Sequence, residues 1–203
     1  NFFKKQNIET IELDSFQTIT LKNNIKLTCS SVGNFDSWLM IEIDNKKILN
    51  LNDCNVSDQE LVKIKKKWNS IDVLLSQFSF ASWICNPNDD LMANKQIERI
   101  KKRVDKQIDI LKPLELIPFA SFFYFCHEEN SYLNKYLINI QNFYQWFNSK
   151  IKVTVLFPEE TYLLDDKHDN SKSLRKWKIA YDKISKKKLI NKVATNDIAY
   201  ILN

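Results

Sequence analysis

Three apolar runs that each open into a polar or aromatic loop constrain most strongly what this chain can fold into. They are KKILNLNDC at residues 46–54, IDVLLSQFSFASW at residues 71–83 and LELIPFASFFYFCHEEN at residues 114–130. In sheets that bind ligands at strand ends, catalytic and binding residues lie in loops of this kind. The three segments therefore predict one shared site at one edge of a sheet.

Composition sets the broad class. With 203 residues, of which 44% are hydrophobic and 12% aromatic, the chain can bury a full core, and residues 1–203 are expected to form a single domain. The net charge of +5 comes from 30 basic and 25 acidic residues and indicates a solvated surface. The one glycine, Gly33, excludes glycine-rich phosphate loops, which need several glycines. No apolar run is long enough to predict a membrane span.

The four cysteines are widely spaced and contain no CxxC pair, which argues against a zinc knuckle and against a disulfide scaffold. Reduced thiols in a cytoplasmic protein are the expectation. The cysteines are Cys29, Cys54, Cys85 and Cys126.

Hydrophobic periodicity divides the chain into two parts. Short alternating runs predict an antiparallel meander with strands at 8–13, 16–21, 25–30, 38–43 and 47–51. Beyond it, helices are predicted at 57–69, 90–112, 130–147 and 171–188, and strands at 72–77, 114–118, 152–157 and 161–164. A weak element is expected at the carboxyl terminus. Ser57 and Glu60 form a capping box that fixes the start of the first helix.

The order of these elements resembles the second half of a metallo-β-lactamase fold. More narrowly, it is similar to the C-terminal part of the CMP-N-acetylneuraminate hydroxylases and their bacterial relatives. The motifs that carry the resemblance are DSWLMIEIDNKKILNLNDC at 36–54, DVLLSQFSFAS at 72–82 and LKPLELIPFASFF at 111–123, with FPEETYLLD at 157–165 in place of a late hairpin.

The resemblance implies an α/β fold, a four-layer αββα sandwich, of which this chain supplies mainly the second half. It also implies a zinc or iron centre on one edge, where Asp53 occupies the position of the bridging carboxylate. The family's HxHxDH motif is not in this chain, which contains only His127 and His168. The expectation is therefore that a missing N-terminal segment or another chain supplies the histidines, because one aspartate cannot hold such a metal.

Asp53 is also a candidate on physical grounds. A carboxylate at the end of a buried strand needs compensation by a hydrogen bond, a cation or a metal. The alternative is that Asp53 caps the following loop or the helix that begins near Ser57. Cys54, the next residue, is expected to pack in the interior, because a reactive thiol would need a nearby cation or helix terminus.

His127 is the candidate catalytic residue. It lies between Cys126 and the carboxylates of Glu128 and Glu129, and imidazole beside carboxylate can act as a general base or as an oriented ligand. The alternative is a surface histidine near a helix start. His168, among acidic and polar neighbours, is expected to lie in a mobile loop.

Aromatic residues follow the two strands that should flank Asp53. Phe78, Trp83, Phe122 and Tyr124 are the candidate substrate-binding residues, in a cleft suited to a flat ring. With cations on neighbouring helices, such a cleft could take a nucleotide sugar. Core packing is the alternative for at least half of these aromatic side chains.

Three functions from different classes remain open. The first is a metal-dependent hydrolase-like domain that acts on a small molecule such as a nucleotide sugar or a surface-glycan precursor. The second is a noncatalytic binding domain that keeps the fold without the metal, and the third is a sugar-nucleotide hydroxylase-like oxidoreductase. Nucleic-acid binding is disfavoured, because acidic residues interrupt the basic clusters and no recognition motif is present.

Overall fold

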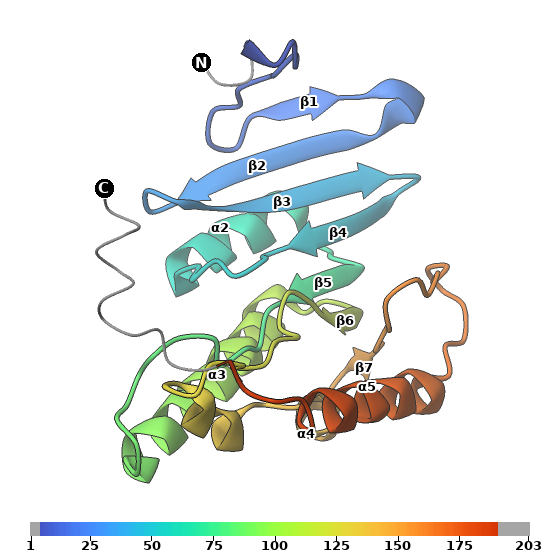
Figure 1. Cartoon of the computed structure of the whole chain (residues 1–203). Coiled ribbons are helices and arrows are strands. Elements are labelled where there is room, and N and C mark those ends of the chain that lie inside the picture. The colour runs from blue at the N-terminus through green and yellow to red at the C-terminus, as the bar shows by residue number, and fades with distance from the viewer. Residues whose placement is uncertain (1–4, 191–203) are drawn as a thin grey trace.

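The described residues form one mixed sheet of seven strands, which lie side by side in the order in which they occur along the chain (Figure 1). The computed structural model describes residues 5–190. β1 to β4 pair in antiparallel fashion, as the predicted meander requires, and β4 to β7 pair in parallel. The predicted α/β class is confirmed.

The elements, in chain order, are β1 (Thr18–Thr20), the 3₁₀ turn η1 (Lys22–Asn24), β2 (Lys26–Val32), β3 (Asp36–Ile43), β4 (Lys46–Asn50), α2 (Asp58–Trp68), β5 (Val73–Ser76), α3 (Asp90–Leu111), β6 (Glu115–Pro118), η2 (Ser131–Tyr136), α4 (Ile140–Phe147), β7 (Lys152–Val153) and α5 (Asn170–Ile184).

One row of apolar side chains crosses the sheet from β3 to β7. Met40 pairs with Leu49, Leu49 with Leu74, Leu74 with Leu116, and Leu116 with Val153. None of the five is more than 4% exposed. Because side chains alternate between the two faces of a strand, the row lies on one face of the sheet. It belongs to a single core cluster with Leu61, Ile64, Ile100, Val104 and Ile108 of the helices α2 and α3.

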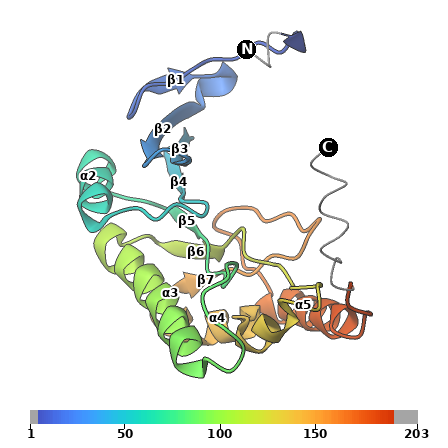
Figure 2. The same ribbon diagram turned by 60° about the vertical axis from the view of Figure 1, so that its left-hand side comes forward.

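The helices that connect the parallel strands share that face. Each of β4, β5 and β6 is followed by a crossover to the next strand in the same direction, and right-handed crossovers in one direction place their helices on one side. Figure 2 shows α2 and α3 on one side of the sheet and the segment that follows β7 on the other. A four-layer sandwich has two sheets, and residues 5–190 contain one.

Side-chain caps set where the helices begin. The Ser57 hydroxyl accepts from the Glu60 amide, which confirms the predicted start of α2. Asp89 caps α3 by accepting from the Met92 amide. Although α3 has 22 residues, it is amphipathic and rich in charge. None of the helices in the described part of the chain is both long enough and apolar enough to cross a membrane.

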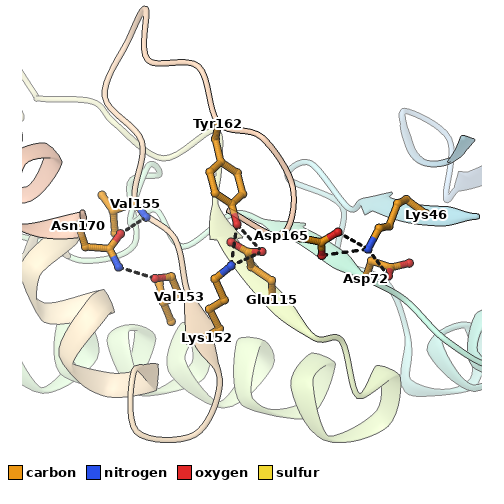
Figure 3. A network of polar contacts seen from close by, with 9 residues as sticks. All are labelled: Lys46, Asp72, Glu115, Lys152, Val153, Val155, Tyr162, Asp165 and Asn170. Atoms are coloured by element: carbon orange, nitrogen blue, oxygen red, sulfur yellow. Dashed lines mark hydrogen bonds and ion pairs between the residues drawn. The ribbon is translucent and has the colours of Figure 1, made fainter. Parts of the chain in front are cut away.

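The segment between β7 and α5 is held to the starts of the parallel strands by a polar network (Figure 3). Lys152 lies 3.2 Å from Oε2 of the buried Glu115, and the Tyr162 hydroxyl donates to the same oxygen at 3.0 Å. Lys46 pairs with Asp165 at 2.7 Å. The network therefore joins β4, β6 and β7 to the segment that crosses the face of the sheet opposite α2 and α3 (Figure 2).

Glu160 fixes the same segment to α5. Its carboxylate accepts from the Phe157 amide at 2.7 Å, from the Ser173 hydroxyl at 2.6 Å and from Lys176 at 2.6 Å. Partial burial acts to raise the pKa of the Glu160 carboxyl, but these hydrogen bonds together lower it to about 2. His168, expected in a mobile loop, instead places Nε2 2.8 Å from the Val155 carbonyl.

Several predicted elements differ from the structure. Residues 8–13 are irregular and largely exposed instead of forming a strand. The helix predicted at 130–147 is divided into η2 and α4, because the Asn139 side chain caps α4 by accepting from the Asn142 amide. The strand predicted at 161–164 does not form, since Tyr162 is used in the network of Figure 3. The weak terminal element lies mostly outside the described residues.

Removing the side chain at the centre of the apolar row should destabilise the protein strongly. Leu74→Ala is expected to cost about 2–5 kcal/mol, because Leu74 is fully buried and the strands around it leave little room to collapse. Leu91→Ala on α3 is the matched control, since Leu91 is 68% exposed. Urea unfolding measures both; equal losses in the two variants would contradict the central role of the row.

The Glu160 contacts should give a stability contribution that depends on pH. The folded pKa is about 2 and the ordinary value is 4.5, so the contribution is complete above pH 4.5 and is lost as the pH falls through 2. Glu160→Gln should lower the melting temperature at pH 7, and its difference from wild type should shrink towards pH 2. The exposed neighbour Glu159, changed to Gln, is the control. A difference that stays constant with pH would contradict this account.

Candidate functional site

The ends of β4, β5 and β6 meet at one edge of the sheet. Asn50 pairs with Leu75, and Ser76 pairs with Pro118, so the residues that follow these three parallel strands emerge next to one another. The sequence-based prediction that the three strand ends share an edge is confirmed. Residues from this edge and from the facing part of α3 form the candidate site.

Asp53 lies in the loop that follows β4, with its side chain exposed to solvent. The loop turns sharply: Asn52 has a φ of 48° and donates its amide to Oδ1 of Asn50, while the Cys54 amide donates to the Leu51 carbonyl. Within the described residues, the Asp53 carboxylate accepts no hydrogen bond and forms no ion pair. Because Asp53 is exposed, its carboxylate does not bear the desolvation cost that its place at a strand end suggested. The alternative that Asp53 caps the helix is wrong, since the N-cap of α2 is Ser57.

Arg103 of α3 is the residue at this edge that the sequence did not single out. Its Nη2 donates to the Gln77 carbonyl at 2.9 Å and to Oε1 of Gln77 at 2.6 Å, which fixes the guanidinium against the end of β5. Burial lowers the pKa of Arg103, and the nearby negative charge of Asp53 acts in the opposite direction. Nε of Arg103 is buried and has no hydrogen-bond partner among residues 5–190.

Side chains close the ends of β5 and β6. The Ser76 hydroxyl donates to Oε1 of Gln107 at 2.6 Å. The Ser121 hydroxyl accepts from the Phe78 amide at 2.6 Å and donates to the Phe119 carbonyl at 2.8 Å. These bonds tie the two strand ends to α3 and to each other. Asp53 and Arg103 therefore lie at an edge whose backbone is held by side-chain hydrogen bonds.

Cys54 is part of the interior, as predicted. Its side chain is 2% exposed, and its thiol donates to the Ser37 carbonyl at 2.8 Å. Burial, with smaller contributions from Asp36 and Asp53, raises the pKa of the Cys54 thiol to about 11. A thiol with this pKa is a weak nucleophile at neutral pH.

The four aromatic candidates occupy different environments. Phe78 is fully buried and packs on Phe143, with ring centroids 4.5 Å apart. Phe122 stacks on Trp177 of α5 with ring centroids 3.7 Å apart. Phe122, Trp177 and Tyr124 all line one apolar cavity of about 120 Å³. Trp83 is 68% exposed. Phe122 and Tyr124 thus face one cavity, whereas Phe78 lies in the core.

His127 lies in the segment after β6. Its backbone forms a bridge with Ile190, and its side chain is half-buried and has no hydrogen-bond partner among residues 5–190. No described contact joins His127 to Asp53. In the same part of the chain, no three His, Cys, Asp or Glu side chains lie close enough together to hold a metal ion. The described residues do not by themselves fit a zinc or di-iron centre.

No known protein-family model matches this sequence, and no curated protein matches it either. Solved structures with a similar arrangement include CmlA, a diiron β-hydroxylase from Streptomyces venezuelae (14% identity, 72% of this chain and 33% of that chain, TM-score 0.46). Others are a metallo-β-lactamase superfamily protein from Thermotoga maritima (18%, 73% and 72%, 0.43) and the metallo-β-lactamase fold protein YhfI from Bacillus subtilis (12%, 75% and 55%, 0.43).

The chain thus spans about a third of the length of CmlA and about half of YhfI. At TM-scores below 0.5 and identities below 20%, these likenesses establish no activity, substrate or metal for this chain.

Thiol reactivity provides a direct check of this geometry. Cys126 is exposed, whereas Cys54 and Cys85 are buried. In the native protein at pH 8, Ellman's reagent should modify Cys126 in the fast phase and Cys54 only upon unfolding. Cys126→Ser should remove the fast phase, and Cys54→Ser should leave it intact. Loss of the fast phase in Cys54→Ser would show that Cys54 is accessible and that its position here is wrong.

Proposed function

We propose that this chain is the carboxylate-bearing half of a metallo-β-lactamase-like, metal-dependent hydrolase, and that Asp53 is one ligand of its metal. The observation that supports the proposal is the position of Asp53, exposed in the loop after β4 at the edge where three parallel strands end. The motifs at 36–54 and 72–82, from which the resemblance was drawn, include this loop and the neighbouring strand end.

The remaining ligands would come from another chain, and the metal would be zinc or iron. Such a metal, when bound, supplies a water of lowered pKa for hydrolysis. The role of this chain would be to present the Asp53 carboxylate on a fixed loop, with the Arg103 charge nearby. His127 would be an imidazole at the rim of the site.

The proposed substrate is a phosphate-bearing small molecule such as a nucleotide sugar, and the proposed location is the cytoplasm. Aromatic and cationic groups support this choice: Phe122 and Tyr124 line a cavity suited to a ring, and α3 carries basic side chains. Hydroxylation of such a substrate is a narrower form of the proposal, because it would also need an electron-transfer centre such as an iron–sulfur domain.

Metal content of the purified protein, together with any polypeptide that co-purifies, tests the proposal. Asp53→Asn should weaken zinc or iron binding by about tenfold or more, since even outer-shell partners change metal affinity by 10–100-fold. The matched control is Asp44→Asn, at the other end of β4, where Asp44 is also exposed. Plasma mass spectrometry and calorimetric titration with Zn²⁺ provide the measurements.

Two results would reject the metal role of Asp53. One is the same metal affinity in Asp53→Asn, Asp44→Asn and wild type. The other is a protein that carries no zinc or iron and binds neither when either metal is added.

A noncatalytic binding domain is the second candidate, and one observation favours it. The Arg103 guanidinium lies close enough to Asp53 for the carboxylate charge to act on it, so the chain itself places a cation near this carboxylate. In this case Asp53→Asn would leave metal content unchanged and would change the environment of Arg103.

A further inference from the structure

A cavity lies between the N-terminal end of α2 and the middle of α3, on the helix side of the edge that carries Asp53. Its volume is about 320 Å³. Asn55, Val56 and Asp58 line it from the start of α2, and basic residues of α3 line the opposite wall. The cavity is distinct from the apolar one lined by Phe122 and Tyr124.

Four cations of α3 line this cavity. Arg99, Lys102, Arg103 and Lys106 recur at helical spacing and therefore occupy one face of the helix. Asp58 is the acidic residue of the lining, and it is already paired with Lys106 at 2.7 Å. Within residues 5–190, Arg99 and Lys102 form no ion pair. Like charges on one face repel each other, so the cavity favours an anion.

Arg103 forms the inner part of the wall. Gln77 holds one end of its guanidinium, and Nε is buried with no hydrogen-bond partner in the part of the chain that the structure describes. A buried N–H donor without an acceptor is costly, and a bound anion would supply the acceptor. Burial lowers the pKa of Arg103 despite the opposing charge of Asp53, which is the direction expected of a cation that lacks full compensation.

The start of α2 completes the lining. The first four amides of a helix have no partner within the helix, and here Ser57 satisfies the amide of Glu60. Asp58 of this first turn lines the cavity, so the positive end of the helix dipole lies beside it. The dipole adds to the cationic side chains in favouring a negatively charged group, while the carboxylates of Asp58 and Glu60 in the same turn offset part of it.

We propose that this cavity binds the phosphate group of a small phosphorylated molecule. Arginine, lysine and helix amides together are the usual partners of phosphate oxygens. The volume is at the lower end of the range for small-molecule sites and exceeds the space that a single phosphate needs. The inference deepens the proposed function by giving a place to the phosphate of the proposed substrate, and binding in this cavity does not require a metal at Asp53.

Pyrophosphate is the probe for the test, with EDTA present so that no metal bridges it to Asp53. Isothermal titration should show binding to wild type, and the double variant Arg99→Gln/Lys102→Gln should bind at least tenfold more weakly. Both residues are exposed, so the variant should fold. The matched control is Lys26→Gln/Lys66→Gln, which removes the same charge from exposed positions outside the cavity.

A second measurement follows the Arg103 side chain itself. Addition of pyrophosphate should shift the Nε–H resonance of Arg103 in an ¹H–¹⁵N spectrum of the wild-type protein, because this donor gains an acceptor. Equal weakening in the two double variants would overturn the proposal by showing attraction to the overall charge of the protein. No shift of the Arg103 resonance at saturating pyrophosphate would overturn it by showing that the anion does not reach Arg103. Failure of the Asp53→Asn metal experiment would leave this result unaffected.

Discussion

The contact on which the rest of the structure depends is the apolar row that runs from Met40 to Val153 across five strands. Each member is buried and directly opposite the next, so a slip of one residue in any strand would turn its side chain to the other face. The row therefore fixes the register of β4, β5 and β6, and this register brings their ends together at one edge. The position of Asp53 relative to the end of β5 is a consequence of core packing.

On the opposite face of the same strands, a second row of side chains changes from apolar to charged towards the edge of the sheet. The neighbouring row runs from Ile41 through Ile48 and Val73 to Glu115 and Lys152, so it begins apolar and ends in an ion pair. Glu115 is almost fully buried and must be compensated there. Lys152 and Tyr162 compensate Oε2 of this carboxylate, while Oε1 is buried without a hydrogen-bond partner among residues 5–190, and these contacts hold the segment after β7 over this part of the sheet (Figure 3).

Local signals in the sequence predicted the elements that depend on local interactions. Ser57 and Glu60 marked the start of α2, and hydrophobic periodicity over 90–112 marked α3, although Leu91, which this pattern assigns to the inner stripe, is exposed. The strand predicted around Tyr162 failed because the Tyr162 hydroxyl is bound by Lys152 and Glu115, which are distant in the sequence. Likewise, the prediction of one helix at 130–147 was wrong because the Asn139 side chain caps a new helix, α4, within that range.

The candidate site was predictable to a similar extent. Adjacent parallel strands must end at one edge, so the shared position of the three loops followed from the pattern alone. The exposure of Asp53 did not, since it depends on the turn at Asn52. Arg103 escaped notice because a basic residue on an amphipathic helix is usually solvated, and only the structure shows that Gln77 holds it against the sheet.

Asp53 and Arg103 also link the two proposed sites. The negative charge of Asp53 acts on Arg103. If both proposed sites exist, the positive charge of Arg103 would oppose the binding of a cation at Asp53. An anion in the cavity beside α3 would neutralise part of that charge and make the carboxylate a better ligand for a metal. Because coupling between two binding sites is reciprocal, a metal at Asp53 would strengthen anion binding to the same extent. The sign of this coupling follows from the charges alone, so a phosphorylated ligand and a metal, if both bind as proposed, would favour each other at this edge of the sheet.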